Sequence, residues 1–548
     1  MSLMATTDES TGAWFGADGQ VSQLRGLLFK AGCLGATLLT LFLVFVFLVY
    51  VAVDAIEPGT ADPAWWATVV ATVALPAVVL SLYYYRSEPR AGEVAYTALG
   101  LPVAAALLAG GVGIVFRHIV SPHEWLALVI AAIIAYGALE VHGRTRDAGA
   151  LERGAVGVVV LGLTIVGVPG LVPSLRALIL SLPVLPMAPL SLLGTFVVPV
   201  GIAVGWYVRR ARESQRAGSI AAGATIAAAA LGVVAGPLAG VSWTTWLILT
   251  TVVGVPVGLY VERVFSGGEG VSGLALPLVI AAGVVACAVV VDAAGFAGPN
   301  VWLDWEFLTA AHSRTPREAG IYPALVGSVM MIIVVAIAAF PVGVGAAIYL
   351  EEYAPSGGLL GSVVELIEIN IANLAGVPSV VYGLLGLALF VKAGALQPGI
   401  VIVGGLTIAL LILPIVIVSA QEAIRGVPDS QRQAAYGMGA TKWQTVRTVV
   451  LPRAMPGILT GTILALGRAI GETAPLLMVG VAAVVRISPT SFFGLFSAMP
   501  RQLYSWAQLA KPDFYHGVLA AGVLVLLIVL LMMNGTAILL RNKYQRRD

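Results

Sequence analysis

Charged side chains are scarce in this chain. Asp, Glu, Lys and Arg together make up 11% of its 548 residues, and hydrophobic residues make up 59%. A soluble globular domain carries about 25% charged residues, so water cannot be the solvent for most of this chain. The composition predicts an integral membrane protein embedded in lipid. A formal net charge of only +2 gives no basis for a nucleic-acid partner.

Cysteine and metal-ligand patterns are also nearly absent. Cys33 and Cys287 lie in separate apolar runs, which favours small packing residues over a disulfide or a metal pair. The five histidines show no ligand spacing. The sequence GxxxxGK[ST] does not occur, so the chain carries no phosphate-cradling loop of that kind. We therefore expect no cofactor in this chain, no catalytic residue and no metal.

Long apolar runs dominate what is present. Because a membrane span needs roughly 20 apolar residues, the runs predict an all-α polytopic membrane protein with about fourteen transmembrane helices. Prolines interrupt 155–190, where a short interfacial helix is expected over Ser174–Leu182. The spans are predicted near 27–53, 64–85, 94–116, 124–141, 155–172, 190–208, 219–239, 243–261, 272–292, 323–350, 369–391, 399–420, 457–484 and 517–540.

Successive short loops alternate between many and few Lys and Arg residues. When the N-terminus is placed in the cytoplasm, the loops that fall inside are richer in Lys and Arg than those outside. This asymmetry is the usual signal of orientation. It predicts a multi-pass protein of the plasma membrane with both termini cytoplasmic.

The chain divides near residue 270, at the Gly/Ser-rich segment Ser266–Gly273. Residues 1–26 are expected to form a cytoplasmic tail. Residues 27–265 contain about eight predicted spans with short loops and few polar groups, and the sequence assigns them no role. Residues 270–548 contain six spans and nearly all of the chemistry.

A polar loop at 421–453 separates two of these six spans. Its first helix is predicted to begin at Asp429, to use a capping box of Ser430 with Gln433, and to end at Gly437 and Gly439. A second helix should begin with a capping box and end at a proline; the residues are Thr441, Gln444 and Pro452. Such a hairpin, held between two spans, is a lever that a soluble partner can push.

Two opposite charges lie in the apolar run 458–480. Arg468 and Glu472 are four residues apart and share a face of the expected helix. A charge at the membrane centre costs at least about 2.5 kcal/mol and marks a polar interior. Arg468 can bind an oxyanion while Glu472 holds it in the absence of the anion. A purely structural salt bridge explains the pair about as well. Thr473 and Pro475 should disturb the helix just beyond it.

A second polar break lies at 369–386. Asn373 enters the membrane there, and the run Gly376-Val377-Pro378-Ser379 interrupts the span. Broken helices are tolerated where they line protein or a cavity. The predicted substrate path therefore contains Arg468, Glu472, Thr473 and Asn373, although a simple packing kink remains the alternative for this break.

The polar loop resembles the EAA loop of ABC importer permeases, with Gln in place of the usual first Glu. The resemblance implies that the loop docks into a cleft of a separate ATP-binding subunit. The matching residues, which we predict to form the ATPase docking site, are Gln433, Ala434, Ala435, Gly439, Leu451 and Pro452, together with Val449.

Residues 270–548 resemble the phosphate-specific ABC permeases of the PstA type. The matching runs are GIYPALVGS (320–328), PVGVGAAIYLEEYA (341–354), NLAGVPSVVYGLLG (373–386) and GRAIGETAPL (467–476). The resemblance implies a type I importer core and inorganic phosphate as substrate. It also implies a PstC-type permease, a PstB-type ATPase dimer that uses ATP and Mg, and a PstS-type phosphate-binding protein as partners.

Two alternatives remain at this point. The first is the same machine working on molybdate or sulfate. The second is a protein of a different class, either an ion-coupled secondary transporter or a non-transporting membrane scaffold, neither of which has an ATPase partner. We predict that the chain is a transporter subunit and not an enzyme, with ATP hydrolysis in a separate ATPase chain.

Overall fold

The computed structural model describes residues 23–146, 150–167, 173–181, 187–355 and 357–545. Within these ranges the chain is helical and contains no β-strand, apart from one isolated bridge between Ile400 and Leu495. The predicted fold class, an all-α polytopic membrane protein, is confirmed. The tail was expected at 1–26: residues 1–22 lie outside the described residues, and residues 23–26 are already helical.

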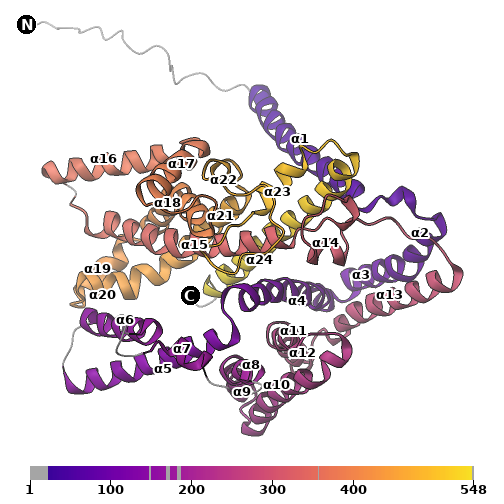
Figure 1. Ribbon diagram of the computed structural model, residues 1–548, viewed down its shortest axis with the longest axis horizontal. Coiled ribbons are helices and arrows are strands. Elements are labelled where there is room, and N and C mark those ends of the chain that lie inside the picture. The colour runs from indigo at the N-terminus through magenta and orange to yellow at the C-terminus, as the bar shows by residue number, and fades with distance from the viewer. Residues whose placement is uncertain (1–22, 147–149, 168–172, 182–186, 356, 546–548) are drawn as a thin grey trace, which may run out of the picture.

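Helices α3 to α12 of the first half occupy the lower part of the view in Figure 1, and α1 lies above them. Their bounds are α1 (Gln23–Ile56), α2 (Pro63–Val69), α3 (Leu75–Ser87), α4 (Pro89–Ile114), α5 (Pro122–Thr145), α6 (Ala150–Val166), α7 (Leu175–Leu180), α8 (Met187–Leu192), α9 (Val198–Arg212), α10 (Gln215–Ala235), α11 (Trp243–Ile248) and α12 (Val255–Gly267).

The helices of the second half include the most buried ones. Their bounds are α13 (Ala275–Ala294), α14 (Trp305–Thr309), α15 (Tyr322–Ile348), α16 (Gly358–Ala375), α17 (Ser379–Gly386), α18 (Val401–Arg425), α19 (Asp429–Gly437), α20 (Lys442–Thr445), α21 (Leu451–Gly471), α22 (Ala474–Met478), α23 (Met499–Trp506) and α24 (Leu519–Gln545).

Thirteen of the described helices, joined across π-helical turns, are long and apolar enough to cross a membrane. The main difference from the predicted fourteen is the span expected at 155–172. Helix α6 has only 17 residues, and Gly167 after it takes a left-handed backbone with φ 77°. Glycine adopts that conformation at no steric cost, so the helix ends there. Residues 168–172 lie outside the described part.

The span predicted at 369–391 is broken, as the sequence indicated. Helix α16 begins eleven residues earlier than the apolar run suggested, at Gly358. The break falls at Gly376–Pro378, and the chain continues through α17 and the π-helical turn η10 (Leu387–Ala393). Pro378 has no N–H to donate and restricts the residue before it, which favours a new helix start.

The largest apolar core lies between α15, α18 and α21. Buried side chains on α15 and α18, such as Met330, Met331 and Ile412, belong to it. Lipid tails are as apolar as these side chains, so close packing rather than the hydrophobic effect holds membrane helices together. Glycines allow that approach: a Cβ on Gly405 would clash with Val334, and one on Gly343 would clash with Val416.

The first half of the chain packs directly on this core. Helix α1 lies against α24, where Val51 and Ala55 are buried with Ala520, and His516 Nδ1 lies 3.1 Å from Asp54 Oδ2. Glu57 accepts a 2.6 Å hydrogen bond from the Trp302 indole. Helix α13, expected to open the six-span core, instead packs beside α2, α3 and α4 (Figure 1).

Candidate transport path and docking hairpin

The first helix of the docking hairpin is α19. It begins at Asp429 after Pro428 and ends at Gly437, as predicted, and Gly439 takes φ 82°. The predicted capping box of Ser430 with Gln433 is wrong, because no side chain makes a capping hydrogen bond at the start of α19. Pro428 occupies the N-cap position, so Ser430 lies inside the helix and cannot cap it.

The second helix begins with the predicted capping box. The Gln444 N–H donates to Thr441 Oγ1 at 3.3 Å, and the Thr441 N–H donates to Gln444 Oε1 at 2.8 Å. The prediction that Pro452 stops this helix is wrong. The chain stays helical from Lys442 to Gly471 through the π-helical turn η11 (Val446–Val450). Pro452 falls in the first turn of α21, where its missing N–H interrupts little.

The hairpin presents an exposed surface. Most of the predicted docking residues are accessible, whereas Ala435 and Leu451 are half-buried; the accessible ones are Gln433, Ala434, Gly439 and Pro452. Three large side chains are also exposed beside them: Tyr436, Met438 at 89% and Trp443 at 54%. Exposed apolar side chains gathered outside a membrane span are typical of a surface that a protein partner covers.

A buried ion pair ties the hairpin to helix α15. The guanidinium of Arg432 in α19 donates to Glu352 Oε1 from Nε at 3.2 Å and from Nη2 at 3.1 Å. Glu352 lies in the π-helical turn η9 (Tyr349–Tyr353), which continues α15. The exposed fractions of the two side chains are only 15% and 6%. Arg432 also donates to the carbonyls of Ile424, at 2.9 Å, and Val427.

A second polar network lies next to it, at the end of α18. Arg425 pairs with Glu351 at 2.7 Å and with Glu368 of α16 at 3.4 Å. The Gln421 amide donates to the same two carboxylates at 2.9 and 3.2 Å. These contacts join α15, α16 and α18 where the hairpin begins. Sequence reasoning missed both networks, although Glu351-Glu352 directly after an apolar run was a signal.

The Arg468–Glu472 pair forms, but not on a continuous helix. Arg468 Nε donates to Glu472 Oε1 at 3.1 Å. Helix α21 ends at Gly471, and Glu472 has extended backbone with φ −74° and ψ 126°. The predicted span at 457–484 is therefore wrong at both ends. Thr473 precedes the short helix α22 and makes no capping hydrogen bond.

The pair is partly accessible. The Arg468 side chain is 49% exposed and that of Glu472 is 16% exposed. Within the described residues, the two terminal guanidinium nitrogens of Arg468 make no hydrogen bond. Asn534 of α24 lies beside this turn, with its Oδ1 about 3.4 Å from where a Cβ on Gly467 would lie. Asn534 is a polar neighbour that sequence reasoning missed.

Asn373 is not joined to the pair. It is exposed on α16, and among the described residues its side chain makes no hydrogen bond to Arg468 or Glu472. The helix after the break does reach α22, because a Cβ on Gly383 would clash with Pro475 and Met478. The two runs that best carry the family resemblance therefore pack against each other.

Comparison with known proteins matches residues 343–543 to the family described as binding-protein-dependent transport system inner membrane component. The phosphate transport system permease protein PstA 1 of Mycobacterium tuberculosis (strain H37Rv) is 35% identical over 268 residues, covering 45% of this chain and 83% of the relative. The permease protein PstC of Mesorhizobium japonicum is 30% identical over 262 residues, covering 42% and 77%.

Among solved structures, the chain is similar to the inward-facing methionine ABC transporter MetNI, with 16% identity and a TM-score of 0.30, covering 41% of this chain and 94% of that chain. The relatives and the many membrane-spanning helices identify a multi-pass permease of the plasma membrane, which is a transport subunit and not an enzyme. The chain therefore belongs to the family of phosphate ABC transporter permeases of the PstA type.

Proposed function

We propose that this chain is the permease subunit of an ATP-driven importer of inorganic phosphate. It forms the path with a PstC-type permease and receives phosphate from a PstS-type binding protein. A PstB-type ATPase dimer binds ATP and Mg²⁺ in separate chains, and this chain needs no cofactor of its own. Residues 270–548 serve as the permease core, 27–265 as an accessory region, and both termini face the cytoplasm.

The observation that carries the anion assignment is the state of Arg468. Its Nε is held by Glu472, while its terminal nitrogens are free of hydrogen bonds within the described residues. A planar fork of donors suits the oxygens of a tetrahedral oxyanion. Glu472 competes for the same guanidinium, which limits how tightly the anion is held and allows it to leave. Phosphate is the oxyanion that the names of the relatives favour.

The docking hairpin supports an ATP-driven cycle of alternating access. The exposed face of α19 and α20 would be covered by the ATPase. When the ATPase dimer closes, it moves α19. The Arg432–Glu352 ion pair then passes this motion to α15, which lies in the core next to α21. The path opens on one side of the membrane at a time because these helices move as packed bodies.

Phosphate uptake into proteoliposomes that hold the full complex tests this proposal. We expect unlabelled phosphate, and not sulfate or molybdate, to compete with labelled phosphate. Arg468→Ala should abolish uptake. The control variant Arg86→Gln removes an exposed arginine of α3, outside residues 270–548, and should leave uptake unchanged. Competition by sulfate or molybdate alone would reassign the substrate. Uptake that needs an ion gradient and no ATPase would reassign the class.

Retention of the ATPase is a separate test of the hairpin. Purified from detergent, the wild-type chain should retain an ATP-binding subunit, and Gly439→Asp should lose it. Asp at this position adds strain at a positive φ and a charge on the docking face. Equal retention by both proteins would contradict the docking assignment.

A further inference from the structure

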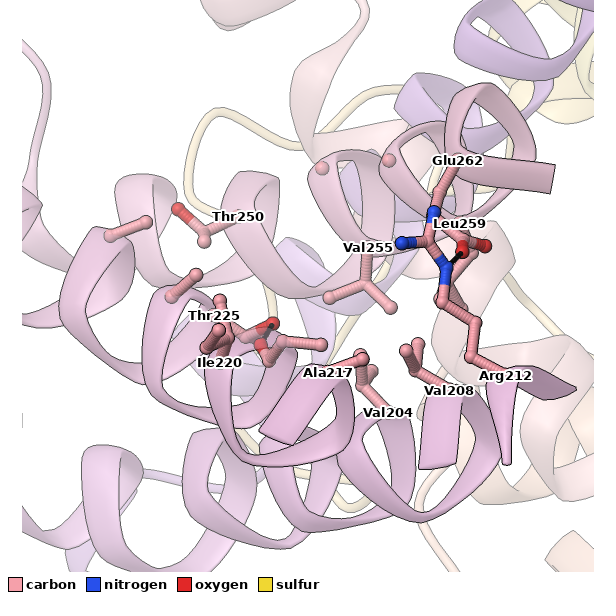
Figure 2. Close-up of a pocket in the computed structure, with 15 residues that line it drawn as sticks. Val204, Val208, Arg212, Ala217, Ile220, Thr225, Thr250, Val255, Leu259 and Glu262 are labelled. Atoms are coloured by element: carbon pink, nitrogen blue, oxygen red, sulfur yellow. Dashed lines mark hydrogen bonds and ion pairs between the residues drawn. The ribbon is translucent and has the colours of Figure 1, made fainter. Parts of the chain in front are cut away.

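The region before residue 270 contains a cavity that the transport proposal leaves unexplained. It measures about 610 Å³ and lies between α9, α10, the π-helical turn η6 (Leu249–Gly254) and α12. Small-molecule and cofactor sites commonly have volumes of about 300–1,000 Å³. Most of its lining is apolar, including Val204, Val208, Ile220, Val255 and Leu259 (Figure 2).

One end of the cavity is charged. Arg212 Nε lies 2.5 Å from Glu262 Oε1, and both residues line the cavity. Figure 2 shows this pair at one end, with apolar side chains and two threonines along the rest. The cavity is therefore apolar over most of its lining and polar at the end where Arg212 and Glu262 lie. That pattern matches a ligand with an apolar body and a charged head.

More arginines lie on α9 near Arg212 in the sequence. They line a second hollow on that helix, which is formed by Trp206, Arg209, Arg210, Glu213 and Gln215. The Arg210 guanidinium lies 5.5 Å from the centre of the Trp206 ring, and Trp206 is 61% exposed. Tryptophan concentrates where the apolar membrane meets water, so this mouth lies at headgroup level. Arg216, the second residue of α10, is also exposed.

The charges do not cancel, because Arg209, Arg210, Arg212 and Arg216 stand against two carboxylates, Glu213 and Glu262. Among the described residues, an ion-pair partner is recorded for Arg212 but not for Arg209, Arg210 or Arg216. A helix–helix junction so rich in arginine is expected on the cytoplasmic side, where lipid headgroups are anionic. Basic pockets between membrane helices on that side commonly bind the headgroups of acidic phospholipids.

We propose that α9, α10 and α12 form a binding site for one anionic phospholipid of the cytoplasmic leaflet. An acyl chain occupies the apolar cavity between Val204 and Leu259. The phosphodiester binds at the polar mouth to Arg212 and to Arg209, one turn before it on α9, while Arg210 and Arg216 add positive charge nearby. Glu262 holds Arg212 when no lipid is bound and competes with the phosphate. The site uses residues outside the permease core, so it stands or falls independently of the transport proposal.

Lipid binding to the full-length protein in detergent tests this site. After delipidation, bound lipid is counted by native mass spectrometry against short-chain phosphatidylglycerol and against phosphatidylcholine with the same chains. We expect phosphatidylglycerol to bind more tightly. Each arginine near a membrane surface contributes about fivefold to such binding. Arg209→Gln with Arg210→Gln should therefore weaken phosphatidylglycerol binding about thirtyfold, and Arg86→Gln should leave it unchanged.

Two further variants separate the cavity from the charges. Ala224→Phe fills the cavity without changing charge and should weaken phosphatidylglycerol binding, whereas Ala227→Phe, on the same helix but outside the lining, should not. Glu262→Gln frees Arg212 and should strengthen binding. Unfolding temperatures in lipid-free detergent must match the wild type, so that loss of binding is not loss of fold.

Three results would overturn the proposal. Equal binding of both lipids would remove the headgroup's role. No effect of Ala224→Phe, together with competition by inorganic phosphate, would make the mouth a site for a free anion. Loss of the second permease on Ala224→Phe, with lipid binding unchanged, would make the cavity a protein contact instead.

Discussion

The Arg432–Glu352 pair offers the sharpest test of how the hairpin moves the core. Glu352→Gln keeps the size of the side chain and removes its charge. Removing one partner of a buried ion pair costs about 3–5 kcal/mol. Arg432 keeps two carbonyl acceptors and Asp429, which lies at 3.1 Å. We therefore expect about 2 kcal/mol, nearer the value of a single charged hydrogen bond.

Two populations are compared here: molecules in which α19 is held to η9, and molecules in which it is detached. A loss of about 2 kcal/mol lowers the ratio of the first to the second about thirtyfold. In proteoliposomes holding the full complex, phosphate transported per ATP hydrolysed should fall severalfold. Retention of the ATPase should not change, because Glu352 is buried beneath the docking face. Asp429→Asn serves as the matched control. It removes the other carboxylate from the same arginine, but that side chain is 85% exposed, so the pair contributes at most about 1 kcal/mol. An unchanged transport ratio in Glu352→Gln, with the pair shown to be broken, would refute the coupling role.

Three other outcomes follow from the structure. Arg468→Lys should keep more phosphate uptake than Arg468→Ala but raise the half-saturating phosphate concentration, because a point charge replaces a fork of donors; equal uptake by both variants and wild type would reduce Arg468 to a structural role. Gly439→Ala should cost about 1–2 kcal/mol from its φ of 82° alone, since no atom lies within 4 Å of the added methyl; weaker retention of the ATPase in a pull-down checks this. Burial and the neighbouring Arg486 and Arg314 lower the pKa of His312, which accepts a 3.0 Å hydrogen bond from Trp506. The unfolded chain then binds the proton more readily, so the unfolding temperature should fall as pH drops below about 6.5, and His312→Gln should flatten that slope.

Local patterns in the sequence predicted local structure well. The Thr441–Gln444 capping box formed because both of its hydrogen bonds join residues three apart. The break at Gly376–Pro378 formed because proline and glycine act on their own backbone. The same reasoning failed at Pro452, where a π-helical turn, invisible in the sequence, absorbs the missing donor.

Long-range contacts were beyond the sequence pattern. Arg432 and Glu352 are 80 positions apart, and nothing in either segment alone specifies the other. Asn534 looked like one polar residue in an apolar helix, and only the packing of α24 on α21 places it beside Gly467. From the sequence, helix α13 is assigned to the six-span core because of its position in the chain, but α13 packs against α2, α3 and α4. Whether residues 270–548 act as a unit stays a prediction.

The contact between α1 and α24 has a consequence for how the chain is made. Asp54 and His516 are 462 positions apart, and they meet only after α24 has entered the membrane. At roughly 5–20 residues per second, α1 waits for about 20–90 seconds after its own synthesis. During that interval the face of Val51 and Ala55 meets lipid, and Asp54 has no histidine beside it. The ribosome therefore makes the partner of the first helix more than 400 residues after that helix, and a chain truncated before α24 leaves α1 without the surface that it covers.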